Sequence, residues 1–309
     1  MNPHLRTGIW RLADPKISIT SVAAMTIGGT VAALEAPLDW FWMLVLGLAL
    51  FCMEVAKNAW GEIYDYDSGT DLAVSAADRT NFSGGKRVLV DQLLSRAQTW
   101  AIAAIAGGMG LGLGALIVFL QAPNVFWLGL ASLVLGWSYH GPPLQLVYRG
   151  WGELAVVLIY GPALALATYM VQRQHISLDV VVLSVPLGIF VSAFLWVNEF
   201  PDYTADRGAN KRNLVVILGR QRASRLLPLI YLAGFLWLLA VPWISNLDSR
   251  VWWGLLALPT ALLACIWTWQ APTSFYRSQP VQPMALLTFV AYPLAVCMAF
   301  FLPTLLAGS

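Results

Sequence analysis

Long apolar runs recur along this chain and constrain its fold more than any other feature. The hydrocarbon core of a membrane is about 30 Å thick, so a helix that crosses it needs about 20 mostly apolar residues. Runs that meet or approach this length cover residues 17–35, 40–60, 97–120, 124–139, 152–171, 179–198, 225–245, 251–270 and 284–306. The sequence therefore predicts an all-α, polytopic membrane protein in which about nine transmembrane helices surround a central cavity capped by cytoplasmic loops.

The composition excludes a large soluble domain. Of the 309 residues, 59% are hydrophobic and 11% are charged, whereas an ordinary soluble domain has about 25% charged residues. The apolar residues are spread over the whole length, so we predict one integral-membrane domain over residues 1–309. Residues 1–16 are too polar for a secretory signal, and we interpret them as a cytoplasmic amphipathic lead-in. Cys52, Cys265 and Cys297 lie inside apolar runs and are interpreted as packing residues.

The basic residues gather in alternate loops, as the positive-inside rule requires. The amino-terminal segment and the loops after the second, fourth, sixth and eighth runs contain most of the Lys and Arg, whereas the other loops contain only Arg173 and Arg250. We therefore expect the amino terminus and the first set of loops to be cytoplasmic, in a bacterial or archaeal plasma membrane. The expected surroundings are a lipid bilayer, with no nucleic acid and no obligatory protein partner.

A first acidic cluster follows the second apolar run. The segment NAWGEIYDYDSGTD contains Glu62, Asp65, Asp67 and Asp71 and opens a long predicted cytoplasmic loop, residues 61–96. Carboxylates this close together repel one another unless a positive charge lies between them. Oxygen ligands of this kind suit a hard divalent cation such as Mg2+.

A second acidic cluster follows the sixth apolar run. In the segment VNEFPDYTADRGANKRN, Asp202 and Asp206 are four residues apart and Glu199 precedes them, within a predicted loop of residues 199–224. A pair of like charges at this spacing costs an isolated helix a few tenths of a kcal/mol. Stability alone would therefore disfavour this arrangement, which indicates a function.

Basic residues follow each acidic cluster. Arg79, Lys86 and Arg87 come after the first cluster, and Lys211 and Arg212 come after the second. Proteins commonly hold Mg2+ with few carboxylates plus substrate phosphate oxygens, while Arg and Lys neutralise the remaining phosphate charge. The pattern indicates a diphosphate substrate with a lipid tail. Either cluster taken alone has another explanation: its acidic residues are simply solvated in a cytoplasmic loop, and its basic residues only set the orientation of the helices in the membrane.

These motifs resemble those of the UbiA-type intramembrane prenyltransferases, whose signatures are approximately N-D-x-x-D-x-x-x-D and D-x-x-x-D on a fold of nine transmembrane helices. The second signature is intact as Asp202 and Asp206. The first resembles the variant N-x-x-N-D-Y-x-D-x-x-x-G-x-D of the menaquinone-pathway branch, except that Gly61 and Glu62 replace Asn-Asp. The segments YHGPPLQLVYRGWGELAVVLIYGPALALATYMVQ and NKRNLVVILGR are similar to the same branch.

The resemblance implies Mg2+-dependent transfer of a polyprenyl group from a polyprenyl diphosphate to an aromatic acceptor resembling a hydroxynaphthoate or another quinone precursor. It implies catalytic roles for Asp65, Asp71, Asp202 and Asp206. These four residues, together with Glu62 and Asp67, are the expected metal ligands. The residues expected to bind the diphosphate are Arg79, Lys86, Arg87, Lys211 and Arg212. The residues expected in the substrate pocket are Asn58, Tyr139, Arg149 and Asn198.

Two other functions stay open at this point. A terpene cyclase of the same family would use the same metal and donor but let an internal alkene attack the allylic cation. A cation-coupled transporter would also carry membrane carboxylates, although these usually lie at the bilayer midplane on broken helices. Glu54 and Lys57, inside the second apolar run, are either a structural ion pair or pocket residues. We interpret His140 as a residue that forms hydrogen bonds in a loop.

Overall fold

The computed structural model describes residues 3–307, so residues 1–2 of the predicted lead-in lie outside the described part. The described residues form helices and loops and contain no β-strand. The elements of the membrane bundle are α2 (Pro15–Glu35), α3 (Trp40–Asp67), α5 (Arg96–Leu120), α6 (Val125–His140), α7 (Gly152–Leu158), the π-helical η3 (Ile159–Ala163), α8 (Leu164–Arg173), α9 (Leu178–Gly208), α11 (Arg220–Ile244), the 3-10 helix η4 (Ser249–Ala257), α12 (Leu258–Gln270) and α14 (Val281–Ala307). The shorter elements are α1 (Pro3–Ala13), α4 (Thr70–Ala73), η1 (Ala76–Asp78), η2 (Leu146–Tyr148), α10 (Leu214–Leu218) and α13 (Phe275–Ser278).

The number of membrane-crossing helices agrees with the prediction. In the described part of the chain, eight helices are long and apolar enough to cross a membrane, and α6 is a shorter apolar helix. Together they match the nine predicted runs. Two of the predicted spans are not single α-helices. The fifth span consists of α7, η3 and α8 in succession, and the eighth consists of η4 and α12. The protein is an all-helical, multi-pass integral membrane protein.

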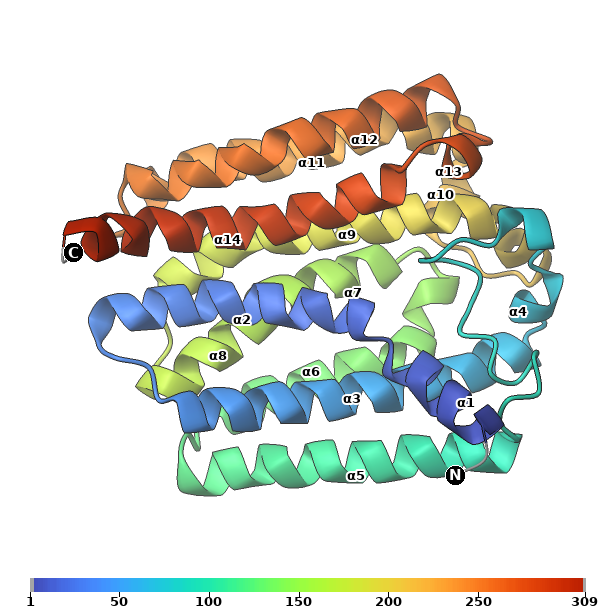
Figure 1. The fold of residues 1–309 in the computed structure, drawn as a ribbon, viewed down its shortest axis with the longest axis horizontal. Helices are drawn as coiled ribbons and strands as arrows, with labels where there is room; N and C mark the ends of the chain where they lie inside the picture. Colours follow the sequence, from blue (N-terminus) through green and yellow to red (C-terminus); the bar gives the residue numbers. More distant parts are fainter. Residues whose placement is uncertain (1–2, 308–309) are drawn as a thin grey trace.

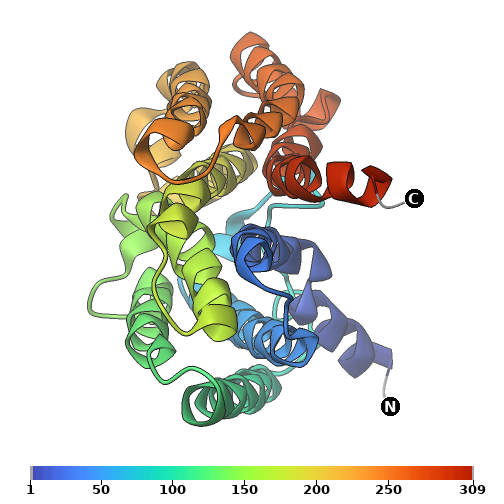
Figure 2. The ribbon, with the colours of Figure 1, turned by 90° about the vertical axis from the view of Figure 1, so that its left-hand side faces the viewer.

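The bundle is built around α9. The helices run roughly parallel in Figure 1, and the end view in Figure 2 shows them arranged around α9 and the interior. The main core contains large buried side chains of several helices, including Phe190, Phe289 and Tyr292. Gly161 of η3 and Gly188 of α9 allow the two backbones to touch, because a Cβ at Gly188 would collide with a carbonyl oxygen of α7. Small residues at such crossings are typical of membrane helices.

Two helices extend beyond the apolar runs that predicted them. Helix α3 continues to Asp67 and α9 continues to Gly208, so the predicted loops 61–96 and 199–224 both begin as helix. Hydropathy marks where a segment leaves the hydrocarbon, whereas backbone hydrogen bonds continue until a residue breaks them. In α3 the break comes at Gly69, whose φ of 80° is left-handed and closes the helix.

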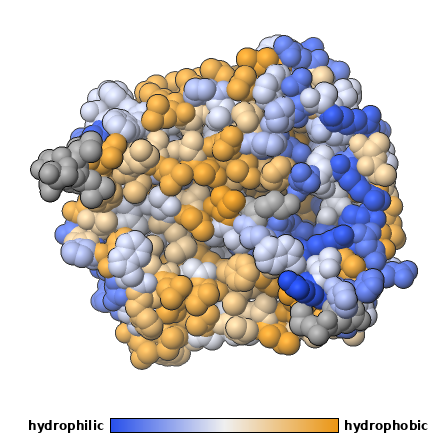
Figure 3. All heavy atoms as spheres, viewed as in Figure 1, coloured by the Kyte–Doolittle hydropathy of each residue, from blue (hydrophilic) through white to orange (hydrophobic). Residues whose placement is uncertain are grey.

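The polar loops lie at both ends of an apolar band. Figure 3 shows hydrophobic side chains across the middle of the molecule and hydrophilic ones concentrated on the side that carries α4 and α10. The two ends of the chain lie on opposite sides in Figure 1, as an odd number of crossings requires. Helix α1 lies at the same end as α4, with Leu12 buried and its carbonyl oxygen accepting a hydrogen bond from Asn58 of α3.

Candidate functional site

A cavity of about 1360 Å³ opens at the end of the bundle that carries α4 and α10. Residues of α1, α3, the loop after α4, α6 and α9 line its polar mouth, and apolar residues of α5 and α6 line much of its inner part. Asp65, Asp71, Asp202 and Asp206 all contribute to this one lining. The fold therefore brings together two motifs that lie far apart in the sequence.

Lys211 connects the two motifs. Its ammonium nitrogen lies 3.2 Å from Asp65 Oδ1 and 3.9 Å from Asp206 Oδ1, so both carboxylates contact the same cation. Burial alone would lower the pKa of Lys211, but Asp65 and Asp206 more than offset this effect and raise the pKa well above its usual value. Lys211 is therefore charged and compensates part of the negative charge at the mouth.

The loop after α4 fixes the other two aspartates. The backbone N–H of Gly84 donates a hydrogen bond to Asp202 Oδ2 at 3.2 Å. Gly85 lies against Asp71 with a φ of 75°, and a Cβ at this position would collide with the Asp71 carboxylate. Only glycine combines this left-handed backbone with so close an approach. The pair Gly84–Gly85 thus sits between the two acidic motifs.

Three aspartate oxygens at the mouth are buried without a hydrogen-bond partner, namely Asp71 Oδ2, Asp202 Oδ1 and Asp206 Oδ1. Burial, followed by the nearby charges of Asp65 and Glu62, raises the pKa of Asp71 to about 8. Buried polar groups normally have partners. Unpartnered carboxylate oxygens that face one cavity are a suitable place for a cation.

These residues fit Mg2+ in the manner expected for a phosphate site. Among residues 3–307, no three Asp, Glu, His or Cys side chains converge closely enough to hold a metal ion on their own. Mg2+ usually takes one or two carboxylates and completes its shell with water and substrate phosphate oxygens. The aspartates around Lys211 fit that requirement, and the unpartnered oxygens of Asp71, Asp202 and Asp206 could act as ligands.

The structure does not bring Asp67 into the cluster. Arg96 binds the Asp67 carboxylate through two hydrogen bonds of 2.5 and 2.7 Å, and both side chains are exposed. Asp67 lies near the end of α3, two residues after Asp65, and therefore points away from the face that carries Asp65. The expectation that Asp67 replaces a metal ligand does not agree with this placement.

Glu62 lines the cavity but is already engaged. Its two carboxylate oxygens accept hydrogen bonds from the backbone N–H groups of Arg87 and Leu89, each at 3.0 Å. The longer arm of Glu62, compared with Asp, lets it reach this returning loop. The geometry thus gives Glu62 an anchoring role in place of the predicted metal-binding role.

The predicted basic residues divide into two groups. Arg79, Lys86 and Arg87 line the cavity together with Lys211. Lys86 forms an ion pair with Asp14, and Arg87 donates to Asp91 and to the backbone oxygen of Asp71. Arg212 and Arg149 are exposed and outside the cavity lining, and Arg149 donates to the backbone oxygen of Pro143. The structure therefore does not support the predicted roles of Arg212 and Arg149.

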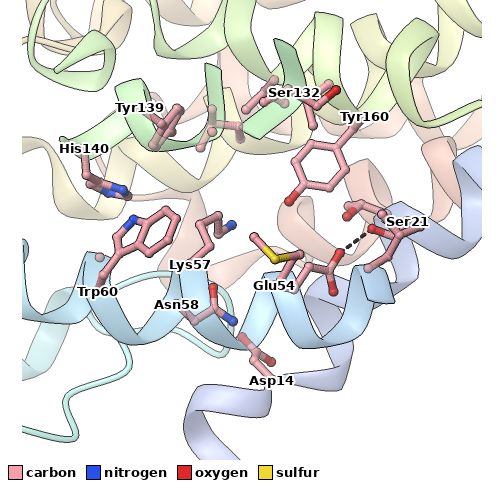
Figure 4. A pocket seen from close by; sticks show the side chains of 18 of the residues that line it. Asp14, Ser21, Glu54, Lys57, Asn58, Trp60, Ser132, Tyr139, His140 and Tyr160 are labelled. Atoms are coloured by element: carbon pink, nitrogen blue, oxygen red, sulfur yellow. Dashed lines mark hydrogen bonds between the residues drawn. The ribbon is translucent and has the colours of Figure 1, made fainter. Parts of the chain in front are cut away.

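The other predicted pocket residues line the cavity. Asn58 and Tyr139 face it in Figure 4, and Asn198 contributes from α9. The Asn58 amide also donates to the carbonyl of Leu12, and Asn198 accepts from Gln282. Each of the two amides therefore ties a neighbouring helix to the wall of the cavity.

Sequence reasoning missed several residues of this site. His140, interpreted as a loop residue, is buried, with Nε2 3.9 Å from Asp65 Oδ2. A Cβ at Gly61 would lie 3.2 Å from the His140 ring, so the glycine that replaces the Asn of the family motif makes room for this histidine.

Two further features of the site were also missed. Glu153 accepts a hydrogen bond of 2.6 Å from the backbone N–H of Leu214 and so positions α10. The adjacent glycines of the segment SGGK were the available signal for the Gly84–Gly85 turn.

Comparison with known proteins identifies the family of this chain. The model of the UbiA prenyltransferase family matches residues 22–292. A 1,4-dihydroxy-2-naphthoate octaprenyltransferase of Bacillus subtilis is 24% identical over 76% of this chain and 76% of its own length. A 2-carboxy-1,4-naphthoquinone phytyltransferase of Synechocystis is 28% identical over 72% of this chain and 69% of its own length.

A solved structure has the same fold. It is that of a UbiA homolog from Archaeoglobus fulgidus bound to DMAPP and Mg2+, with a TM-score of 0.67 and 15% sequence identity, over 94% of this chain and 98% of that one. The family model covers most of the sequence, and the resemblance inferred from the motifs is confirmed. The chain belongs to the UbiA prenyltransferase family.

Proposed function

We propose that this prenyltransferase transfers a prenyl group from a prenyl diphosphate to a hydroxynaphthoate-like aromatic acceptor, that it depends on Mg2+, and that its site faces the cytoplasm. One observation carries the proposal: aspartates from the end of α3, from α4 and from the end of α9 line one cavity mouth around Lys211, and three of their carboxylate oxygens have no hydrogen-bond partner. The naphthoate-type acceptor is supported by the names of the relatives described above.

The residues at the mouth would hold the diphosphate. Asp65, Asp71, Asp202 and Asp206 would bind Mg2+, which when bound neutralises the negative charge that grows on the leaving diphosphate. Lys211 would bind a diphosphate oxygen directly, since its ammonium group already lies between the two aspartate pairs. Arg79 lines the same mouth and would approach the outer oxygens.

The inner part of the cavity would hold the prenyl chain and exclude water. Its α5 and α6 walls include Leu111, Ile117, Leu130 and Leu133 together with Gly114 and Gly129. Leu111 and Leu130 are both exposed although they line the cavity, so this part offers an apolar surface to a hydrocarbon. A hydrocarbon tail can therefore extend along these helices while the allylic carbon stays near the diphosphate. Exclusion of water protects an allylic cation until the aromatic ring attacks it.

The test is an assay of the purified protein in lipid. Labelled prenyl diphosphates of several lengths are incubated with a panel of hydroxynaphthoates and hydroxybenzoates, with Mg2+ or with EDTA, and the products are identified by mass. We expect a prenylated aromatic product that requires both the acceptor and Mg2+. A cyclised hydrocarbon formed without any acceptor would indicate a terpene cyclase instead. The absence of diphosphate release at saturating substrates would reject both the prenyl transfer and the cyclisation.

Binding gives a second measurement that does not depend on turnover. Mg2+ together with inorganic diphosphate should raise the thermal unfolding temperature of the wild-type protein, because both ligands bind the folded state only. The Asp206→Asn variant should lose most of this increase. An equal increase in the variant would contradict the assignment of Asp206 to the metal.

A further inference from the structure

The loop after α4 is attached to α13 through one carboxylate that the site described above does not use. Asp78, the last residue of η1, accepts hydrogen bonds at Oδ1 from the Tyr276 hydroxyl at 2.9 Å and from the Arg277 guanidinium at 2.6 Å. Ser75 donates to its other oxygen, Oδ2, at 2.7 Å. We call the bonds from Tyr276 and Arg277 the Asp78 contact. It joins two loops that are far apart in the sequence.

The Asp78 contact is stronger than an ordinary surface ion pair. The Asp78 side chain is only 16% exposed, although that of Arg277 is 51% exposed. Isolated exposed pairs contribute little to stability, whereas hydrogen bonds between charged groups are among the stronger ones. Burial acts to raise the pKa of Asp78, but the hydrogen bonds from Arg277, Ser75 and Tyr276 more than offset this effect and lower the pKa below its usual value. Asp78 is therefore ionised at neutral pH.

Helix α13 is itself fixed to α9. Phe275 is fully buried and packs on Phe200 of α9 at a centroid distance of 5.1 Å. The Tyr276 ring packs edge-to-face on Phe275 at 5.5 Å. Phe200 lies two residues before Asp202 in the same helix. The donors of the Asp78 contact are thus supported by the helix that carries the second acidic motif.

On its other side, Asp78 is followed directly by Arg79 at the cavity mouth. Arg79 lines the cavity, and its guanidinium donates to the carbonyl of Val74 at 3.4 Å. Gly84 lies beside it, since a Cβ at Gly84 would be 3.4 Å from Arg79 Cγ and 3.6 Å from Arg79 Cα. The N–H of Gly84 in turn donates to Asp202. Contacts therefore run from Asp78 through Arg79 and Gly84 to Asp202.

The segment 78–84 is thus held on α9 at three points. The Asp78 contact holds its start, Phe82 packs on Phe194 of α9 at a centroid distance of 5.7 Å, and Gly84 holds its end at Asp202. Arg79 lies next to the start, so the Asp78 contact restrains it most directly. A long side chain that is ordered before its ligand arrives loses less entropy on binding.

We propose that Asp78 is a positioning residue of the prenyl-transfer site: through its contact with Tyr276 and Arg277, it holds Arg79 at the cavity mouth in the position that binds the diphosphate. This inference rests on the proposed function and adds to it a residue outside the cavity lining. Asp78 touches neither the diphosphate nor the metal and acts only through Arg79.

Binding of inorganic diphosphate tests the proposal without turnover. Diphosphate is titrated, in the presence of Mg2+, into the protein in lipid nanodiscs, and the Kd is measured by calorimetry. Arg79→Gln should weaken binding about tenfold, as expected for the loss of a charge-assisted hydrogen bond. Asp78→Ala and Arg277→Gln should each weaken it about threefold or more, but not beyond the effect of Arg79→Gln. Arg277→Lys keeps the charge and should stay within about twofold of the wild type.

A double variant shows whether Asp78 acts through Arg79. Asp78→Ala combined with Arg79→Gln should bind diphosphate as tightly as Arg79→Gln alone, because the group that Asp78 positions is already missing. Independent contributions would instead multiply, as they do for residues that are not coupled. Multiplied effects overturn the proposal, and so does an unchanged Kd in both Asp78→Ala and Arg277→Gln.

Controls separate a folding defect from a loss of positioning. Asp248→Ala breaks an exposed ion pair of 2.7 Å with Arg250 at the opposite end of the bundle and should keep the wild-type Kd. The unfolding temperature without ligand shows whether each variant is folded. If Asp78→Ala does not fold, Arg277→Gln and Tyr276→Phe test the same contact from α13.

The outcome can be distinguished from that of the proposed function. Diphosphate binding that depends on Asp78, in a protein that makes no prenylated aromatic product, would retain the inference and reject prenyl transfer. Prenyl transfer with the same donor KM in the wild type and in Asp78→Ala would retain the function and reject the inference. A wild-type protein that binds no diphosphate in the presence of Mg2+ would reject both.

Discussion

At the scale of single residues, one lysine makes the acidic mouth of the cavity possible. Asp65 and Asp206 come from different helices and both contact Lys211. Without a cation their carboxylates would repel one another in a buried setting, where charges are weakly screened. Lys211 therefore compensates part of this negative charge, and its ammonium group would also be available to the diphosphate.

The different surroundings of Asp202 and Asp67 lead to opposite expectations for the same substitution. Asp202→Asn should lower turnover at least about 100-fold, because stabilisation of a leaving group by a metal supplies several kcal/mol. The fold should be retained, since the Asn side chain can still accept the hydrogen bond from Gly84. Asp67→Asn removes an exposed carboxylate paired with Arg96 and should keep near-normal turnover. Steady-state kinetics of both variants check this, and equal losses would contradict it.

At the scale of elements, the site is made by two helix ends and the loop that returns between them. The ends of α3 and α9 carry Asp65, Asp202 and Asp206, and the short helix α4 carries Asp71; the loop after α4 places Gly84 and Gly85 against Asp202 and Asp71. Glu62 fastens the same loop through two backbone hydrogen bonds. The carboxylates therefore keep their positions only if this loop keeps its path.

A methyl group at Gly85 should disturb Asp71. Gly85→Ala adds both backbone strain at positive φ, about 1–3 kcal/mol, and a collision with the Asp71 carboxylate. Gly69→Ala adds similar strain at a φ of 80° but places its Cβ in open space. We expect Gly85→Ala to lose the thermal shift caused by Mg2+ and diphosphate and Gly69→Ala to keep it. The same shift in both variants would show that contact with Asp71 is unimportant.

The glycines on the inner walls of α5 and α6 should control the length of the prenyl chain. Gly114 and Gly129 line the cavity, and a Cβ at either position meets no atom within 4 Å. Gly114→Leu and Gly129→Leu should therefore fold and narrow the groove, so that long donors lose more kcat/KM than short ones. Gly112→Leu is the matched control, because Gly112 has the same open space but lies outside the cavity lining. Kinetics with donors of increasing length measure the effect, and a uniform decrease for all donors would contradict it.

At the scale of the whole molecule, an odd number of crossings separates the two ends of the chain. The end with α4 and α10 carries the candidate site, and the opposite end carries the carboxyl-terminal part of α14 (Figure 1). The concentration of Lys and Arg at the site end predicts that this end is cytoplasmic. The orientation decides from which compartment the diphosphate substrate reaches the cavity.

Labelling of single cysteines checks the orientation. In a variant without Cys52, Cys265 and Cys297, Ala76→Cys and Ser249→Cys place one exposed thiol at each end. A membrane-impermeant maleimide should label Ala76→Cys only in inside-out vesicles and Ser249→Cys only in right-side-out vesicles or intact cells. The reverse pattern would place the site on the outer side of the membrane.

The sequence by itself determined the membrane class, the number of crossings and the two acidic motifs that supply the aspartates of the cavity. These features depend on local properties, since apolar length sets a span and the order of nearby residues sets a motif. The ends of α3 and α9 were placed too early because hydropathy does not report backbone hydrogen bonds. Which Asp faces the cavity followed from the helical register, which separated Asp65 from Asp67.

Only the tertiary structure decided which residues complete the site. Lys211 lies between the acidic motifs, Gly85 lies against Asp71, and His140 occupies the space that Gly61 leaves. Each of these contacts joins residues from different segments of the chain, so its existence depends on how helices and loops pack. The sequence gives the type of each side chain directly. Its contacts with side chains of other helices depend on how closely the helices pack, which is a property of the whole bundle.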